Sequence, residues 1–193
     1  MSEQCFQKVT PELEKELRAM FPGKVYTGSE INEDYFHDEM PIYGKGMPEA
    51  VIEAGSTEDV SKIMKLCYEN NIPVTPRGAG TGLTGAAVAL DGGVMIDMTK
   101  MNKIISYDEE NFVVTVQPGV LLNDLAEDAQ KRGLLYPPDP GEKFATLGGN
   151  VSTNAGGMRA VKYGCTRDYV RSMTVVLPNG EVTEFGATVS KTS

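Results

Sequence analysis

The chain has 193 residues, 40% of them hydrophobic and 23% charged, which is the composition of an ordinary globular domain. Its net charge of −9 at pH 7 argues against nucleic acid or an anionic membrane surface as a partner. The three cysteines lack a CxxC spacing and no apolar run approaches the ~20 residues that cross a bilayer, so we expect free thiols, no zinc site, no integral membrane segment and a cytoplasmic location.

Hydrophobic periodicity and turn residues predict alternating helices and strands along much of the chain. In chain order these are a helix at 11–21, an irregular segment at 24–48, a strand at 50–54, a helix from Ser56, strands at 72–76 and 94–98, a strand pair at 103–107 and 112–117, a helix at 121–132, and a hairpin at 173–177 and 181–185. Residues 186–193 are polar and show no terminating structure. The only histidine, His37, lies in the irregular segment, and a surface or structural role is favoured over catalysis.

The strand at 72–76 leads into an unusual run of small residues, Gly78–Gly85, in which four of eight residues are glycine. So little side-chain bulk does not build a core, but it lets the backbone approach a ligand closely with its N–H groups pointing outward. Amides in this arrangement suit a phosphate or pyrophosphate. A flexible surface linker is the alternative, and it is disfavoured because Arg77, Thr81 and Thr84 stand among the glycines.

Residues 80–85 match G-x-G-x-x-G, the dinucleotide fingerprint, after a strand and with Asp97 near the end of the next one. The match fails on length, because only the seven residues 86–92 precede the third strand and a crossover with a helix needs at least ~10–12. A P-loop is excluded because no Gly-Lys-Ser/Thr follows the glycines. What remains is a phosphate-binding loop that works through backbone amides without a helix dipole.

A second unusual stretch spans Tyr136–Gly164. It opens with a rigid turn, Pro137–Gly141, and continues through Thr146–Gly157, where Asn, Ser and Thr stand among glycines. These side chains can bond phosphate oxygens or the polar edge of a ring system. Taken alone, the stretch would be interpreted as two β-turns joined by a polar loop. Two glycine stretches in one small domain instead favour a single extended nucleotide cofactor.

The two stretches resemble the FAD segments of the FAD-linked oxidases, which are flavoproteins of the vanillyl-alcohol oxidase or p-cresol methylhydroxylase type. Pro76–Gly85 looks like the pyrophosphate loop, and Pro137–Pro140 with Leu147–Gly157 resembles the second FAD segment at the matching spacing. The resemblance covers most of the chain. It is strongest to the branch that holds glycolate oxidase, D-lactate dehydrogenase and D-2-hydroxyglutarate dehydrogenase.

The resemblance implies an α+β fold, a p-cresol methylhydroxylase-type FAD-binding domain of two α/β lobes. A small parallel-strand lobe would span residues 1–100, and a larger, mostly antiparallel lobe would span 101–193 and be truncated at its C-terminus. Covalent relatives carry a histidine where this chain has Thr81, so FAD is expected to bind non-covalently. The implied FAD contacts are Pro76, Arg77, Gly78, Ala79, Gly80, Thr81, Gly82, Leu83, Thr84, Pro138, Asp139, Thr146, Gly149, Asn150, Ser152, Thr153, Gly156 and Gly157.

The implied reaction of the full-length protein is oxidation of a 2-hydroxy acid, of the glycolate or D-lactate type, by hydride transfer to flavin N5. The substrate would bind through a cap domain that the family carries beyond the position of Ser193, and an electron-transfer protein is a possible partner. We therefore expect an inactive fragment that binds FAD weakly, with no residue that can be assigned as catalytic. Two alternatives stay open: another FAD-linked oxidase, such as a reductase of cell-wall precursors or an ether-lipid synthase, or a non-catalytic FAD- or nucleotide-binding subunit that acts with a partner.

Overall fold

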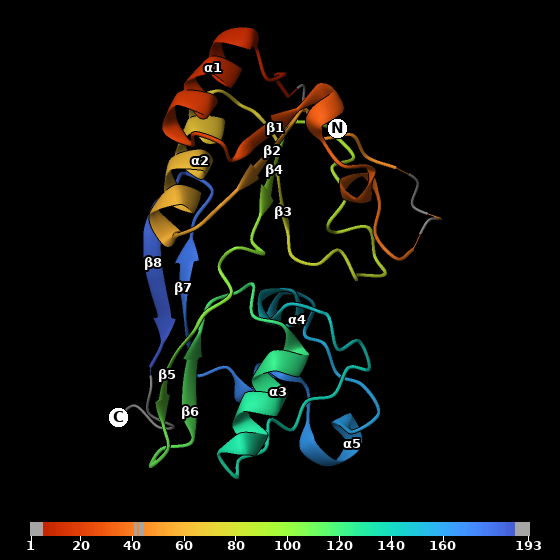
Figure 1. Ribbon diagram of the computed structural model, residues 1–193, viewed down its shortest axis with the longest axis vertical. Helices are drawn as coiled ribbons and strands as arrows, with labels where there is room; N and C mark the ends of the chain where they lie inside the picture. Colours follow the sequence, from red (N-terminus) through yellow and green to blue (C-terminus); the bar gives the residue numbers. More distant parts are fainter. Residues whose placement is uncertain (1–5, 41, 43–44, 188–193) are drawn as a thin grey trace, which may run out of the picture.

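The computed structural model describes residues 6–40, 42 and 45–187. Its helices are α1 (Pro11–Met20), α2 (Thr57–Glu69), α3 (Leu122–Lys131), α4 (Leu147–Thr153) and α5 (Ala160–Tyr163). Its strands are β1 (Val25–Thr27), β2 (Ala50–Glu53), β3 (Val74–Arg77), β4 (Val94–Asp97), β5 (Ile104–Asp108), β6 (Val113–Val116), β7 (Ser172–Val176) and β8 (Val182–Gly186). Figure 1 shows β1–β4 with α1 and α2 in one half of the molecule, and β5, β6 and α3–α5 in the other.

The first four strands form one sheet in the order β1-β2-β4-β3. β2, β4 and β3 are parallel, whereas β1 pairs antiparallel with β2. Central strands of parallel sheets are covered on both faces, and β4 is buried at every position. The carboxyl ends of the three parallel strands meet at one edge of the sheet, and the glycine run leaves β3 from that edge.

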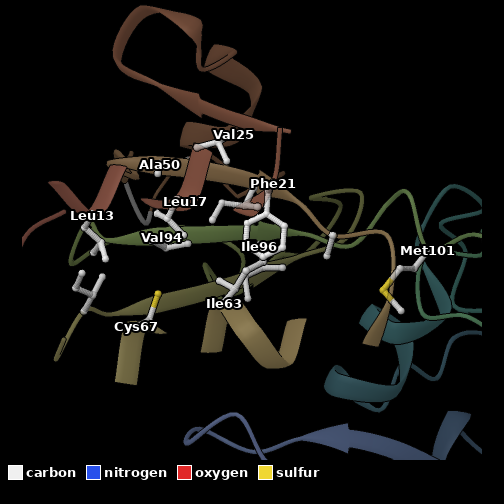
Figure 2. Close-up of a cluster of buried hydrophobic side chains, with 13 residues drawn as sticks. Leu13, Leu17, Phe21, Val25, Ala50, Ile63, Cys67, Val94, Ile96 and Met101 are labelled. Carbon is white, nitrogen blue, oxygen red and sulfur yellow. The ribbon is translucent and has the colours of Figure 1, made fainter. Parts of the chain in front are cut away.

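The two faces of the sheet enter different hydrophobic clusters, because successive residues of a strand point to opposite faces. One cluster lies between the sheet and the helices α1 and α2, and Figure 2 shows it; its members include Leu13, Leu17, Ala50, Ile52, Ile63, Cys67, Val94 and Ile96. The opposite cluster contains Ile31, Val51, Ala89 and Met95. The segment between β1 and β2 and the loop after β3 therefore cover the face that the helices leave open.

Local signals set the start of both covering helices. The Thr10 hydroxyl accepts a hydrogen bond from the Leu13 N–H at 3.3 Å at the start of α1. The Ser56 hydroxyl accepts one from the Asp59 N–H at 3.1 Å at the start of α2. Such an N-cap typically contributes about 0.5–2 kcal/mol. The predicted starts of these two helices are confirmed to within one residue.

The elements β5, β6, α3 and α4 share a smaller core, built around Val120, Leu122, Leu125 and Leu147. β5 pairs antiparallel with β6, and β7 pairs antiparallel with β8. The turn of the second hairpin lies against α2, where the Ser61 hydroxyl donates to the Gly180 carbonyl oxygen at 2.6 Å. This contact ties the last hairpin of the chain to the first half of the molecule.

The structure contains every predicted helix and strand, with ends that differ by one or two residues. Two regions differ. The polar stretch 147–153 forms a helix, α4, rather than turns, and the irregular segment 24–48 contains β1 and two 3₁₀ turns at Gly28–Glu30 and Glu33–Phe36. Residues 41, 43 and 44 of that segment, and 188–193 of the expected unstructured tail, lie outside the described residues. The division into two lobes near residue 100 stays a prediction.

Candidate cofactor site

The glycine run after β3 has a series of unused backbone donors. Among the described residues, the seven amides from Gly78 to Thr84 donate no hydrogen bond, whereas the Gly85 amide donates to Asp38 Oδ2 at 2.7 Å. Gly80 has a φ of +74°, a backbone conformation that glycine adopts without strain. Successive free amides in a curved loop form the kind of concave site that binds phosphate oxygens.

The guanidinium of Arg77 is engaged by the protein itself. The residue is 7% exposed, and its guanidinium donates to the carbonyl oxygens of Asp34 (2.7 Å), His37 (2.9 Å) and Ala87 (3.0 Å). The group also lies 5.7 Å from the centroid of the Tyr35 ring. Burial lowers the pKa of the Arg77 guanidinium, which still carries its charge, as arginine does in proteins. The charge of Arg77 is therefore used within the protein.

Half-buried Tyr35 and buried Asp97 form a hydrogen-bonded pair close to Arg77. The Tyr35 hydroxyl donates to Asp97 Oδ2 at 2.6 Å, and the Thr99 N–H donates to Asp97 Oδ1 at 2.7 Å. Burial, with the neighbouring carboxylate, raises the pKa of the Tyr35 hydroxyl. Both oxygens of Asp97 are thus bound within the protein, which agrees with the exclusion of a Rossmann-type ribose contact by this residue.

The two predicted cofactor segments meet at Gly78 and Thr146. A Cβ at Gly78 would collide with Thr146 Oγ1, so only glycine allows this approach. The same oxygen accepts a hydrogen bond from the Gly149 N–H at 3.3 Å and caps α4. The Leu147 N–H donates to the Val120 carbonyl oxygen at 2.8 Å, which holds the start of α4 against the segment before α3. Figure 1 shows α4 between the sheet and α3.

The helix α4 carries a buried side chain with an unmet hydrogen bond. Asn150 is 4% exposed, and its Nδ2 has no partner among the described residues. An unsatisfied buried donor costs about 1–3 kcal/mol, which a ligand with an acceptor atom would recover. The hydroxyls of Ser152 and Thr153 differ, because they donate within the helix to the carbonyl oxygens of Gly148 (2.8 Å) and Gly149 (3.0 Å).

The Pro137–Gly141 turn is joined to the segment that follows α4. Asp139 forms an isolated β-bridge with Gly157, and its carboxylate pairs with Arg159 Nε at 3.3 Å. Gly157 has a φ of +98°, and a Cβ there would collide with the Asp139 carbonyl oxygen. Pro138 is buried in the same turn. Three predicted site residues, Pro138, Asp139 and Gly157, therefore lie together.

The predicted site residues occupy three neighbouring places. They are the end of β3 with the loop after it (Pro76, Arg77, Gly78, Ala79, Gly80, Thr81, Gly82, Leu83 and Thr84), α4 with its cap (Thr146, Gly149, Asn150, Ser152 and Thr153), and the proline turn with the segment that it pairs with (Pro138, Asp139, Gly156 and Gly157). Sequence reasoning did not single out Tyr35 or Arg159, and it placed Asp38 only in an irregular segment. Each of these three side chains contacts a residue far away in the sequence, and no local sequence pattern indicates such a contact.

A separate cavity of about 470 Å³ lies beside β5 and α3. Arg132 there lies 4.2 Å from the Tyr107 ring centroid and pairs with Asp128 (3.2 Å) and Glu109 (3.3 Å). Burial raises the pKa of the Tyr107 hydroxyl to about 12. Arg132 is thus already paired with two carboxylates, so the glycine loop is the better candidate for a phosphate site. Over the ranges that the structure describes, no cluster of His, Cys, Asp or Glu could hold a metal ion, and no helix is long and apolar enough to cross a membrane.

Residues 48–186 match the FAD binding domain family. The chain belongs to this family. A D-lactate dehydrogenase of Anaerostipes hadrus is 69% identical over 193 residues, which are 100% of this chain and 41% of that protein. Glycolate oxidase subunit GlcD of Bacillus subtilis is 44% identical over 158 residues, 81% of this chain and 33% of that protein. The chain thus spans less than half the length of these two curated relatives.

Solved structures of two enzymes share the fold. An alkyldihydroxyacetonephosphate synthase matches with a TM-score of 0.81 and 26% identity, over 94% of this chain and 39% of that one. A p-cresol methylhydroxylase matches with a TM-score of 0.76 and 29% identity, over 89% of this chain and 34% of that one. The predicted fold class, the FAD-linked oxidase resemblance and FAD as the cofactor are confirmed.

Proposed function

We propose that this chain is the FAD-binding part of a flavin-dependent dehydrogenase that oxidises a 2-hydroxy acid of the D-lactate or glycolate type. The identities to proteins named D-lactate dehydrogenase and glycolate oxidase subunit support the substrate class. The observation that carries the cofactor site is the run of unpaired amides from Gly78 to Thr84, placed against Thr146 at the start of α4.

The residues of the site fit the polar groups of FAD. The free loop amides suit the pyrophosphate, the orphaned Nδ2 of Asn150 supplies a donor on α4, and Pro138 and Asp139 would border the flavin end. Because Thr81 offers no ring nitrogen for a covalent bond, binding would be non-covalent. We propose the residues expected from the sequence as the binding set, in which Arg77 shapes the loop and does not contact FAD itself.

When bound, FAD supplies a hydride acceptor at flavin N5. The residues of this chain would bind and orient the cofactor, since no described side chain stands out as a base for the substrate hydroxyl. Substrate capture would belong to a cap domain, and reoxidation to an electron-transfer partner protein. We further propose two lobes that meet near residue 100, with FAD between them, and a cytoplasmic location in keeping with the unpaired Cys67 and Cys165.

The test is the visible absorption spectrum of the purified 193-residue chain after addition of FAD and desalting. Partial retention of the flavin band is expected, because the fragment binds FAD weakly, together with no detectable oxidation of D-lactate or glycolate. A chain that stays colourless with FAD but retains another nucleotide would contradict the cofactor assignment. Turnover by this chain alone would contradict the division of labour with a cap domain.

Asn150→Leu tests the fit at α4. A leucine of similar size removes the orphaned donor, so the free chain should gain about 1 kcal/mol of unfolding free energy, while FAD affinity should fall about tenfold. Urea unfolding and FAD titration measure the two effects. Asn154→Ala is the matched control: its Oδ1 accepts from the Arg167 N–H at 3.0 Å, so this change should lower stability. A loss of stability in Asn150→Leu would show that its amide is satisfied in solution.

A further inference from the structure

The segment Asp34–Glu39 contacts the glycine loop through several hydrogen bonds, and none of them uses the free amides from Gly78 to Thr84. Arg77 at the start of the loop and Ala87 just after it are joined through one guanidinium, which also donates to the carbonyl oxygens of Asp34 and His37. A Cβ at Gly80 would collide with this guanidinium, so the loop folds directly over it. The loop is thus closed around a buried cation that makes three hydrogen bonds to backbone.

Two further contacts fix the loop from the same segment. Asp38 is 5% exposed, and its Oδ2 accepts from the Gly85 N–H at 2.7 Å while its Oδ1 accepts from the Met40 N–H at 2.9 Å. The Glu39 N–H donates to the Gly82 carbonyl oxygen at 3.2 Å. These bonds engage the Gly82 carbonyl oxygen and the Gly85 amide, and they leave the two amides between them unpaired.

The charges of these groups show that the contacts hold the loop rather than attract the cofactor. The carboxylate of Asp38 repels a pyrophosphate, so it weakens binding unless its role is to order the loop. Arg77 offsets the negative charge of Asp38, but its guanidinium already donates hydrogen bonds to three carbonyl oxygens. A loop that is already ordered loses less conformational entropy when a ligand binds.

We propose that Asp34–Glu39 acts as a clamp that holds Gly78–Gly85 in the conformation that binds FAD, with Arg77 and Asp38 as positioning residues. The inference rests on the proposed FAD site. It assigns a function to a segment that the sequence left without one, and it gives Arg77 an indirect role in place of a phosphate contact.

The test compares FAD affinity, thermal stability and amide hydrogen exchange in the 193-residue chain. Arg77→Met should weaken FAD binding about 20-fold, as expected if the binding conformation falls to ~5% of the population. The Gly85 amide, whose acceptor Asp38 remains, should exchange at least tenfold faster. Asp38→Ala should weaken binding about tenfold, and Asp38→Asn should restore part of the loss because it keeps an acceptor oxygen for Gly85.

Arg18→Met is the matched control. Arg18 also makes several hydrogen bonds in the same half of the molecule, to Glu14, the Val25 carbonyl oxygen, Thr27 and Glu30, but none to the loop. It should lower the melting temperature while changing FAD affinity less than twofold. Equal losses of affinity in Arg18→Met and Arg77→Met would overturn the clamp, as would unchanged affinity in Arg77→Met.

The outcomes separate the clamp from the proposed function. If the parent chain binds no FAD, the proposed site is contradicted. The exchange rate of the Gly85 amide in Arg77→Met, compared with that in the parent, then still tests whether the clamp orders the loop. Unchanged Gly85 exchange in Arg77→Met overturns it. If Arg77→Met does not fold, the comparison of Asp38→Ala with Asp38→Asn decides: equal FAD affinity in both variants and the parent chain overturns the clamp.

Discussion

Gly82→Asp is expected to abolish FAD binding and leave the fold of the free chain intact. Gly82 lies in the middle of the free amides, and a Cβ there meets only Asp38 Oδ2, at 3.9 Å. The backbone needs no left-handed conformation at this position, so an L side chain is tolerated. The new carboxylate would stand where we place the pyrophosphate. Two unit charges about 4 Å apart repel by about 4 kcal/mol at an effective dielectric constant near 20, which is roughly a 1000-fold loss of affinity.

The measurement is a titration of FAD into the parent chain, Gly82→Asp and Gly82→Asn, with a melting curve for each. Asparagine has the size of aspartate without its charge, so Gly82→Asn should lose much less affinity than Gly82→Asp. Melting temperatures should stay close to that of the parent, because a Cβ at residue 82 makes only an ordinary van der Waals contact, with Asp38 Oδ2 at 3.9 Å. Equal affinity for FAD in Gly82→Asp and the parent would remove the pyrophosphate from this loop.

The position of the loop was predictable because its signal is local. Gly78 lets the backbone pass close to Thr146, and Gly80 lets it pass close to the Arg77 guanidinium. A run of small residues after a strand indicates such close contacts of the backbone in the sequence. The length of the segment before β4 was enough to exclude a Rossmann crossover. Thr146, which contacts Gly78, was also among the predicted site residues, since it begins the second glycine-containing stretch.

The helix α4 was not predictable from local propensity. Glycine, asparagine, serine and threonine all favour turns or caps over helix interiors. The helix forms because tertiary contacts outweigh that preference: Leu147 is buried in the small core, and the Gly148 N–H donates to the Pro118 carbonyl oxygen at 2.8 Å. A Cβ at Gly148 would press on Pro118, so glycine is required there by packing rather than by a turn.

The segment 34–39 was not predictable for a different reason. Arg77 binds its carbonyl oxygens, and every residue carries one, so the contact leaves no trace in the side-chain pattern. Asp38 is informative only when Gly85 is known to lie beside it, 47 positions along the chain. The sequence therefore predicts the ligand-facing side of the loop and says little about the side that supports it.

Gly157→Ala is expected to cost about 3–5 kcal/mol of unfolding free energy, which is in the range of severe single substitutions. Gly157 combines a φ of +98° with contact against the backbone of Asp139 and Pro140, so a Cβ has no flexible neighbour to displace. The chain at 157 and the turn at Asp139 would have to separate, and the β-bridge between them would be lost. FAD affinity should fall as well, because we propose that Pro138 and Asp139 border the flavin end.

Gly141→Ala provides the control, because Gly141 ends the same proline turn that contains Asp139. Its φ of +90° is close to that of Gly157, but nothing lies within 4 Å of an added Cβ. Strain alone should therefore cost about 1–2 kcal/mol at this position. Urea unfolding of the two variants separates the clash from the strain. If both lose the same free energy, the chain at Gly157 moves freely away from Asp139, and the bridge cannot be what holds the proline turn in place.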